Sequence, residues 1–509
     1  MLLLNSGRVE ASWITRGLVN RLKVTTLPGQ GCLSWTPDNG PRLWPGVTML
    51  SGVCVILVLT LGQAVLGEEA GYRSYKLVKV DAPSELKLRA IVSGRDWVDV
   101  FSSEGVSLTA MVPPRHLAEL IRVVKSQGGK ITVLHEDMQK VADEEYRERM
   151  RHRRRRAVTT KEQDLLTYLD LDKQYAFQDK ILSGSSNAHM VKERIGRSSE
   201  DRDINLIRIS ADASGQKKRT IFIDAGIHAR EWIAPATANY ILYQLAYNAS
   251  SAGLLRDFNW EIVPVLNPDG YRYSHVSSRY WRKNRQGNTG SQCIGTDLNR
   301  NFGYPQHMPS AGGSSNPCSD IYSGPSKLSA PESRALKNYL DSHNDTIVAY
   351  LSLHSFGRYI LYPWGYSLTA TPSDAAELER VAQVANKAMS DDYITGSSSK
   401  ALYVAAGGSD DYAKGGAKID YSYTIELPPG MSSRYNFAPP TSSIPGYTSE
   451  AWNGVQALAR ELAKVTAIAA PTTTKITTTT TTTQKPIPVQ SPYYWLYQWL
   501  KDQGVILGK

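Results

Sequence analysis

The sequence predicts an α/β fold, a sheet covered by helices on both faces, preceded by a small α+β unit. Two observations predict the larger part. Between residues 157 and 470, apolar runs of strand length alternate with segments of helical apolar spacing. The runs are nearly continuous in apolar residues, which is typical of strands that are buried on both faces. A third observation, a shorter strand–helix–strand order over residues 68–150, predicts the smaller unit.

The N-terminal region contains a candidate export signal. Residues 1–48 show no clear periodicity, and the apolar run MLSGVCVILVLTLGQAVLG follows at residues 49–67. The run ends in small residues, as a signal peptide does before its cleavage site, and it is too short for a persuasive membrane span, which needs roughly 20 apolar residues. We expect Met49 to be the initiator and residues 1–48 to be a non-native extension. A signal anchor behind a cytosolic tail is the alternative.

Residues 68–150 predict a small α+β sandwich that is long enough to fold by itself. We expect a helix where proline opens and glycine closes an apolar helical pattern, at residues 113–128. Strands are expected at residues 75–80, 106–112 and 130–136.

An arginine-rich run, RERMRHRRRR at residues 147–156, carries much of the formal net charge of +10. A nucleic-acid-binding protein spreads basic residues along a binding face, and this sequence does not. In an exported chain such a run is an exposed, flexible target for proteases that cleave after basic residues. We therefore expect cleavage within residues 151–156, with an inert basic linker as the alternative.

The larger unit, residues 157–470, alternates strands and helices. Strands are expected at residues 220–226, 260–267, 348–355 and 421–427, and helices at residues 235–248, 330–343 and 375–389. Cys32 and Cys54 precede the expected signal cleavage, so Cys293 and Cys318 remain, and an isolated pair in an exported domain most simply forms a disulfide.

The C-terminal residues 471–509 differ in composition from the rest of the chain. PTTTKITTTTTTTQKP is typical of an O-glycosylated stalk. The aromatic segment after it is too short to cross a bilayer. A surface anchor, a partner helix and chance clustering of apolar residues at a chain end remain open for it.

Candidate metal ligands stand where predicted strands end. His228 and Glu231 follow the strand at residues 220–226, and a histidine and a glutamate one helical turn onward can converge on one zinc ion. The pair alone is a weak signal, because a surface salt link or a helix N-terminal carboxylate has the same pattern. His354 ends another apolar strand, and the carboxyl ends of strands are where open α/β sheets bind ligands.

Several segments in order resemble the pancreatic-type zinc metallocarboxypeptidases, the A and B enzymes: HAREW, WRKNR, GTDLNRNF, LSLHS, LYPWGY, GGSDDYAKG and YTIEL. The resemblance spans residues 157–470. It implies a mixed, mostly parallel twisted sheet, one zinc ion per catalytic domain, a disulfide between Cys293 and Cys318, and an inhibitory propeptide, which residues 68–156 fit. Carboxypeptidase A is itself a known case of a His–His–Glu zinc site, so the ligand set comes from the resemblance.

The resemblance also assigns the centre of the site. His228, Glu231 and His354 match the zinc ligands. Asp297 matches the carboxylate that accepts the other ring N–H of His228 and fixes its tautomer. Glu426 matches the general base, which takes a proton from water and delivers it to the leaving amine.

Substrate contacts follow by the same resemblance. Arg285, in WRKNR, matches the arginine that stabilises the developing oxyanion. Asn299 and Arg300 match the clamp for the terminal carboxylate of the substrate. Tyr403 matches the mobile tyrosine that closes over the bound residue, and Arg230 matches a further substrate contact. Taken singly, each of these positions has a structural alternative, such as a loop cation, a turn cap or a packed ring.

Specificity depends on Asp410, the first aspartate of GGSDDY. It matches the pocket position that carries aspartate in B-type enzymes, where a carboxylate would pair with a C-terminal Lys or Arg. One extra residue before Glu426, relative to the family pattern, leaves open that Asp410 and Asp411 exchange roles or that both are solvated. Phe356 stands where family members often have tyrosine, and we expect no chemical consequence.

We therefore expect a secreted, monomeric zinc metallocarboxypeptidase, made as a zymogen, that removes single residues from peptide or protein C-termini and prefers Lys and Arg. A basic-specific protease would activate it. We expect neither a nucleic-acid partner nor a stable membrane span. The alternatives are A-type specificity for aromatic or aliphatic ends, and a non-catalytic secreted binding protein on the same fold, which would commonly have lost the base or a ligand.

Overall fold

The structure is a computed structural model that describes residues 3–5, 8–15, 18–25 and 71–468, apart from residues 93–94, 96, 155–159, 185–187, 214–217, 432 and 434. The signal predicted at residues 49–67 and the tail at residues 471–509 lie outside the described residues. Near the N-terminus a three-stranded antiparallel sheet consists of β1 (Leu3–Asn5), β2 (Arg8–Thr15) and β3 (Leu18–Thr25).

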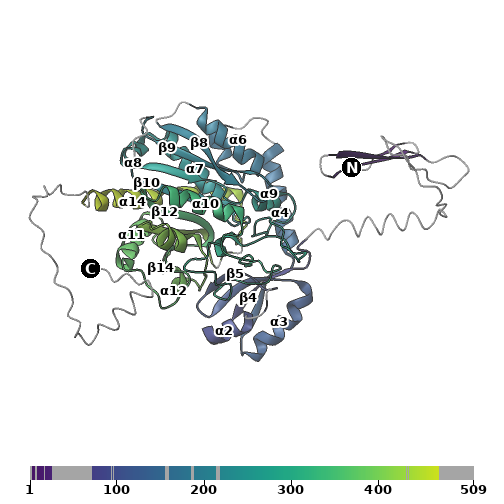
Figure 1. Ribbon diagram of the computed structural model, residues 1–509. Helices are drawn as coiled ribbons and strands as arrows, with labels where there is room; N and C mark the ends of the chain where they lie inside the picture. The colour runs from purple at the N-terminus through teal and green to yellow at the C-terminus, as the bar shows by residue number, and fades with distance from the viewer. Residues whose placement is uncertain are drawn as a thin grey trace, which may run out of the picture. The chain divides into compact units, whose positions relative to one another are not determined.

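An eight-stranded mixed sheet forms the centre of the larger unit, in the order β14-β13-β15-β12-β10-β11-β9-β8 (Figure 1). The strands are β8 (His189–Arg197), β9 (Asp203–Ser210), β10 (Thr220–Ala225), β11 (Asn259–Val263), β12 (Ile347–Gly357), β13 (Tyr359–Tyr362), β14 (Ile394–Ser397) and β15 (Tyr421–Gly430). Strands β11, β10, β12 and β15 pair in parallel, whereas β9 pairs antiparallel with β8 and β11, and β13 antiparallel with β15. The predicted mixed, mostly parallel sheet is confirmed.

Helices cover both faces of this sheet. The helices are α5 (Lys161–Asp164), α6 (Leu171–Leu182), α7 (Ile233–Tyr247), α8 (Ala252–Asp257), α9 (Pro268–Val276), α10 (Pro331–Ser342), α11 (Ala375–Ala388), α12 (Ser398–Ala401), α13 (Ser409–Asp411) and α14 (Ile444–Ile468). Within the described residues, no helix is both long enough and apolar enough to cross a membrane.

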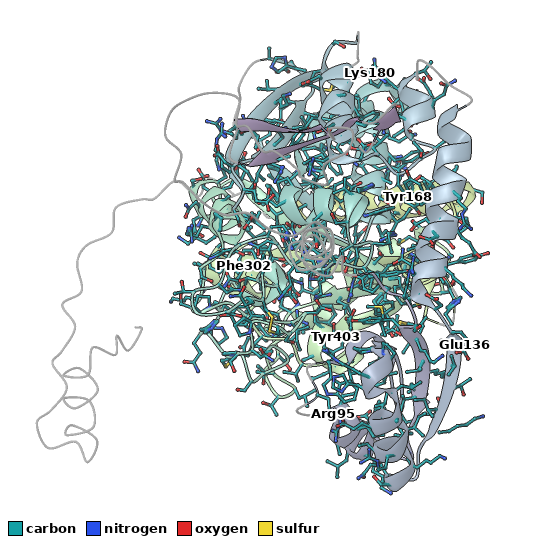
Figure 2. The ribbon with its side chains drawn as sticks, turned by 90° about the vertical axis from the view of Figure 1, so that its right-hand side faces the viewer. Arg95, Glu136, Tyr168, Lys180, Phe302 and Tyr403 are labelled. Carbon is teal, nitrogen blue, oxygen red and sulfur yellow. A yellow bond between two sulfur atoms is a disulfide. The ribbon has the colours of Figure 1, made fainter. Side chains whose placement is uncertain are left out.

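Two hydrophobic cores result, one on each face of the sheet. Because successive side chains of a strand point to opposite faces, Ile221 and Ile223 pack into the first core, with α6, α7, α11 and α14, while Phe222 packs into the second, with α10. Figure 2 labels one member of each core, Tyr168 of the first and Phe302 of the second.

A smaller antiparallel sheet, in the order β5-β6-β4-β7, precedes the larger unit. Its elements are β4 (Lys76–Asp81), α2 (Glu85–Val92), β5 (Asp99–Glu104), β6 (Ser107–Val112), α3 (Pro114–Ser126) and β7 (Lys130–His135). The sequence predicts β4, β6, α3 and β7 but not β5 or α2. A separate core of residues such as Val80, Leu108 and Leu120 fills the space between sheet and helices, so this is the expected α+β sandwich.

Helix α4 (Met138–Arg154) leads out of the smaller unit. The sequence predicted a flexible run here, yet the backbone is helical through Arg154. Arginine and glutamate are good helix formers, and the segment is rich in both, which accounts for the difference. Residues 155–159 lie outside the described part of the chain.

Candidate active site

Three neighbouring parallel strands, β10, β12 and β15, bring the predicted metal ligands and base to one edge of the sheet. Ala225, the last residue of β10, pairs with Leu353 of β12, so His228, three residues on, arrives beside His354. His354 in turn pairs with Glu426 of β15. Two local expectations are corrected: Glu231 lies in the connection between β10 and α7 rather than on a helix, and His354 lies within β12, which continues to Gly357.

His228, Glu231 and His354 converge on a single point. All three are buried, and one ligand atom of each lies within 4.8 Å of the others. Nδ1 of His228 is 2.8 Å from Glu231 Oε1 and 3.1 Å from Nδ1 of His354. Nδ1 of His354 is in turn 3.2 Å from Glu231 Oε2. Two imidazole nitrogens this close require a proton or a cation between them.

The charges around this point suit a divalent cation. Burial opposes ionisation of Glu231, but the adjacent histidines hold the pKa of its carboxyl below the usual value. Burial lowers the pKa of His228, which favours the neutral imidazole that binds metal. Two imidazoles and a carboxylate form a catalytic type of zinc donor set with room for a further ligand. The predicted zinc site is therefore confirmed in His228, Glu231 and His354.

Further groups orient the three ligands. Nε2 of His228 lies 3.2 Å from Asp297 Oδ1, the partner expected from the sequence. Burial opposes ionisation of Asp297, yet Arg282 and His228 hold its pKa well below the usual range. The backbone N–H of Ser355 donates to Glu231 Oε2 at 3.1 Å.

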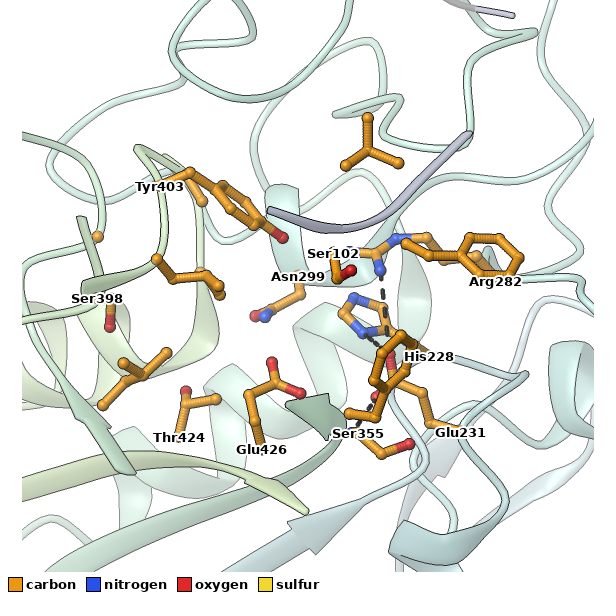
Figure 3. Close-up of a pocket in the computed structure, with 18 of the residues that line it drawn as sticks. Ser102, His228, Glu231, Arg282, Asn299, Ser355, Ser398, Tyr403, Thr424 and Glu426 are labelled. Atoms are coloured by element: carbon orange, nitrogen blue, oxygen red, sulfur yellow. Dashed lines mark hydrogen bonds and ion pairs between the residues drawn. The ribbon is translucent and has the colours of Figure 1, made fainter. Parts of the chain in front are cut away.

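A cavity opens beside the metal ligands, and most of the predicted substrate contacts line it. Figure 3 shows Ser398, Thr424 and Glu426 on one side and Arg282, His228 and Glu231 on the other. The predicted residues that line it are Asn299, Arg300, Tyr403, Asp410 and Glu426. Burial raises the pKa of Glu426 to about 8, with His354 acting in the opposite direction, so this carboxyl is suited to exchange a proton near neutral pH.

The structure places Arg285 away from the cavity. Its guanidinium lies 3.8 Å from the ring centre of Tyr273 and 3.9 Å from Glu200, and it does not line the cavity. Arg282, three residues earlier in the same segment, does line it. Arg282 is buried, donates from Nε to Asp297 Oδ2 at 3.0 Å, and has Nη1 4.0 Å from Glu231 Oε1. No sequence signal distinguishes Arg282 from Arg285, because both arginines stand in WRKNR, a segment without helix or strand periodicity.

The candidate carboxylate clamp is held by backbone contacts. Asn299 Oδ1 accepts from Ser409 N at 2.8 Å, and Arg300 donates to the carbonyl oxygens of Gly312 and Asn299, both at 2.8 Å. The Tyr403 ring lies 5.9 Å from the Arg300 guanidinium carbon, and Tyr403 is 38% exposed. Tyr403 is thus partly exposed while it lines the cavity.

The two adjacent aspartates have different surroundings. Asp411 accepts from the backbone N–H groups of Gly365 and Tyr366 at 2.8 and 3.0 Å. Asp410 lines the cavity and accepts from the Ser398 hydroxyl at 3.1 Å. Burial raises the pKa of Asp410. Both aspartates are buried rather than solvated, and of the two only Asp410 is among the residues that line the cavity.

The smaller unit contributes to the same cavity through its edge strand β5, from which Val100, Phe101 and Ser102 line it. The ladder between β5 and β6 is irregular between Val100 and Ser102, which releases Phe101 from the regular pairing. The Phe101 ring packs edge-on against Phe437 at 4.8 Å.

Two buried arginines hold the smaller unit. Arg230, which the sequence assigned to substrate, does not line the cavity and donates to Asp99 through Nη1 and Nη2 at 2.6 and 3.1 Å. Arg279 donates to Glu145 of helix α4 at 2.5 and 3.1 Å. Elsewhere, Cys293 and Cys318 form the predicted disulfide.

Comparison with known proteins agrees with this arrangement. A family model described as Zinc carboxypeptidase matches residues 176–454, more than half of the chain. Carboxypeptidase B of Astacus astacus is 37% identical over 303 residues, 58% of this chain and 97% of that protein. Carboxypeptidase A1 of Bos taurus is 32% identical over 421 residues, 80% of this chain and 97% of that protein.

Two solved structures are also similar. The carboxypeptidase A from Helicoverpa armigera has a TM-score of 0.72 at 28% identity and covers 78% of this chain and 99% of its own. Thrombin activatable fibrinolysis inhibitor has a TM-score of 0.65 at 28% identity, covering 77% and 99%. The named carboxypeptidases include both A and B forms, so their names do not decide between the two specificities.

Proposed function

The chain belongs to the zinc carboxypeptidase family, and from that premise we propose that it is a secreted zymogen whose released enzyme removes C-terminal Lys or Arg. The family activity itself, zinc-dependent hydrolysis at the C-terminus of a peptide, follows from membership together with the complete His–Glu–His ligand set. The preference for basic residues, the zymogen character and secretion are the proposal.

The reaction divides among residues of this chain. Zinc, when bound, supplies Lewis-acid polarisation of the scissile carbonyl and makes water more acidic. Glu426 takes a proton from the attacking water and returns it to the leaving amine, a task that its raised pKa of about 8 suits. Arg282, oriented by Asp297, stabilises the negative charge that develops on the carbonyl oxygen. Asn299 and Arg300 hold the terminal carboxylate of the substrate.

The observation that carries the proposed specificity is the placement of Asp410. Asp410 is 6% exposed, lines the cavity and accepts a hydrogen bond from the Ser398 hydroxyl. A buried carboxylate is costly unless it is paired with a cation. A substrate Lys or Arg side chain supplies that cation, whereas a phenylalanine side chain leaves the charge unpaired.

A paired-substrate assay tests the specificity. The activated protein is given peptides that differ only in a C-terminal Arg or Phe, and we expect a higher kcat/KM for Arg. Asp410→Asn should lower kcat/KM for Arg by about 30-fold or more, the cost of leaving one charge of a buried pair uncompensated, with a smaller effect on Phe. Asp420→Asn, the same change at an exposed position, is the control. Faster release of Phe by the unaltered protein would indicate A-type specificity instead.

The zymogen proposal rests on the smaller unit. Residues 68–156 act as an inhibitory propeptide, because β5 borders the cavity and Asp99 occupies the guanidinium of Arg230. Cleavage within residues 151–156 by a basic-specific protease then precedes activity. Basal activity of the intact chain equal to that of the cleaved enzyme would contradict this role.

Secretion is supported by the signal-like run at residues 49–67 and by the disulfide between Cys293 and Cys318. The N-terminal sequence of protein recovered from the medium should begin near residue 68. Retention of the chain in the cell, with residues 49–67 uncleaved, would contradict export by a cleaved signal.

A further inference from the structure

We propose that Asp224 orients the zinc ligand His354 through the hydroxyl of Ser352, so that a buried carboxyl group stands behind each of the two histidine ligands. For His228 that group is Asp297, in direct contact with the ring. For His354 the link has one additional member. Neither Asp224 nor Ser352 has a role in the proposed mechanism up to this point.

The sheet register places the three residues in a row. Asp224 of β10 and Ser352 of β12 are direct cross-strand partners in the parallel ladder. His354 follows Ser352 by two residues on the same strand, and therefore projects from the same face. Asp224 is also only four residues before His228, so β10 and the turn that follows it supply one ligand and the support of the other.

The hydrogen bonds link the His354 ring to the Ser352 hydroxyl and the hydroxyl to the Asp224 carboxyl. Nε2 of His354 is 3.1 Å from Ser352 Oγ, and Ser352 Oγ is 3.1 Å from Asp224 Oδ2. Nδ1 of His354 faces Glu231 and His228, so a neutral ring that binds metal through Nδ1 carries its proton on Nε2. That N–H donates to the Ser352 hydroxyl, which donates its own proton to Asp224.

Burial makes the chain of hydrogen bonds matter for the metal site. Asp224 and Ser352 are both 0% exposed and His354 is 1% exposed, so solvent does not compete for these contacts. The Ser352 hydroxyl donates to Asp224 Oδ2, and the neighbouring Tyr350 hydroxyl also interacts with this carboxyl. A rotated His354 ring would leave its buried N–H without the serine acceptor, at a cost of about 1–3 kcal/mol.

Zinc affinity of the full-length chain tests the proposal, measured by competition with a chelator of known affinity. Ser352→Ala should weaken zinc binding by about 10-fold or more, the usual effect of losing a partner of a histidine ligand. Asp224→Asn should weaken it in the same direction. Because both changes interrupt one chain, the double variant should bind zinc no more weakly than Ser352→Ala alone.

Ser333→Ala is the matched control, because Ser333 is also 0% exposed but lies on α10, and its hydroxyl has no hydrogen-bond partner among the residues that the structure describes. Cobalt is a second probe. The absorption spectrum of the Co²⁺-loaded protein should change in Ser352→Ala and remain unaltered in Ser333→Ala, which a general packing defect would not produce.

Zinc affinity in Ser352→Ala equal to that of Ser333→Ala would overturn the proposal. Additive losses in the double variant would show that Asp224 acts by another route, and would also overturn it. If Asp224→Asn does not fold, judged by circular dichroism of the metal-free protein, the two serine variants decide the matter. Absence of zinc binding in the unaltered chain would instead contradict the zinc carboxypeptidase function, so the two failures are distinguishable.

Discussion

Replacing Asp99 by asparagine should loosen the smaller unit from the active site without altering the enzyme itself. Asp99 is the carboxylate partner of Arg230, which is 1% exposed. The amide keeps the shape and one acceptor oxygen but removes the negative charge. Arg230 would retain Tyr280 O at 3.3 Å and the ring of Phe437, whose centre lies 4.4 Å from its guanidinium carbon, but neither is charged. The compensating charge that remains would come from Asp320, which also favours the ionised guanidinium.

The size of the effect follows from the burial of the pair. Loss of one partner of a buried ion pair costs about 3–5 kcal/mol. We take the lower end, about 3 kcal/mol, because Asp99 is 11% exposed and asparagine still accepts a hydrogen bond. If docking of the unit blocks the cavity, the population of the open form rises on the order of 100-fold, since each 1.4 kcal/mol is a factor of about 10.

The assay is the basal activity of the uncleaved chain on a small substrate, expressed relative to the same protein after activation. Asp99→Asn should raise this ratio on the order of 100-fold, up to the limit set by full activity. Glu136→Gln is the control, because Glu136 pairs with Lys76 of the same unit but its side chain is 75% exposed, and such a pair contributes about 0–1 kcal/mol. After cleavage and removal of residues 68–156, the variant and the unaltered enzyme should be identical.

An unchanged basal ratio in Asp99→Asn, in protein whose melting temperature matches that of Glu136→Gln, would refute the reasoning. It would mean that the Arg230–Asp99 contact does not hold the unit over the cavity. A lower activity of the variant after cleavage and removal of residues 68–156 would also contradict it, since Asp99 is then no longer present.

Three further predictions concern the site itself. Arg282→Ala should lower kcat by about 100- to 1000-fold, the usual loss when an oxyanion donor is removed, while Arg285→Ala stays near the unaltered value; the reverse order would restore the assignment to Arg285. Burial raises the pKa of Asp410, and only its ionised form pairs with a cation. The ratio of kcat/KM for Arg to kcat/KM for Phe should therefore rise with pH, with a midpoint above the usual carboxyl pKa of about 4. A ratio that does not vary with pH would contradict an ionised Asp410. A chelator should abolish turnover and added zinc should restore it. Turnover that survives complete removal of metal would exclude the zinc mechanism. Absence of turnover with zinc bound would favour a binding protein.

The central strands were predictable because their sequences are almost wholly apolar. The runs around Ile223, Leu351 and Ile425 identify β10, β12 and β15, and a His or Glu that follows each run marks the site edge. Strand β8 was not predictable in this way, because it lies at the edge of the sheet, where exposed and half-buried side chains alternate without an apolar run. The edge strand β5, which reads DVFSSE, is similarly inconspicuous.

The site residues were likewise predictable on strands and not predictable in segments without regular structure. Those on strands or directly after them, such as His354 and Glu426, follow from strand position plus the resemblance. Arg282 and Arg285 lie in a segment without regular structure, so neither periodicity nor the motif letters determine which guanidinium faces the cavity. Ser352 was hidden for another reason: a serine within an apolar strand has no sequence signal that distinguishes a partner of a ligand from a packed hydroxyl.

The positions of Asp99 and Glu145 have a consequence for timing. Both lie upstream of residues 151–156, so a cut in the arginine-rich run leaves the contacts with Arg230 and Arg279 in place. Severing the backbone and switching on catalysis are then separate events. The delay between them is the lifetime of a non-covalent complex. The rate at which the smaller unit dissociates therefore depends on the ion pairs of Arg230 and Arg279 rather than on the protease.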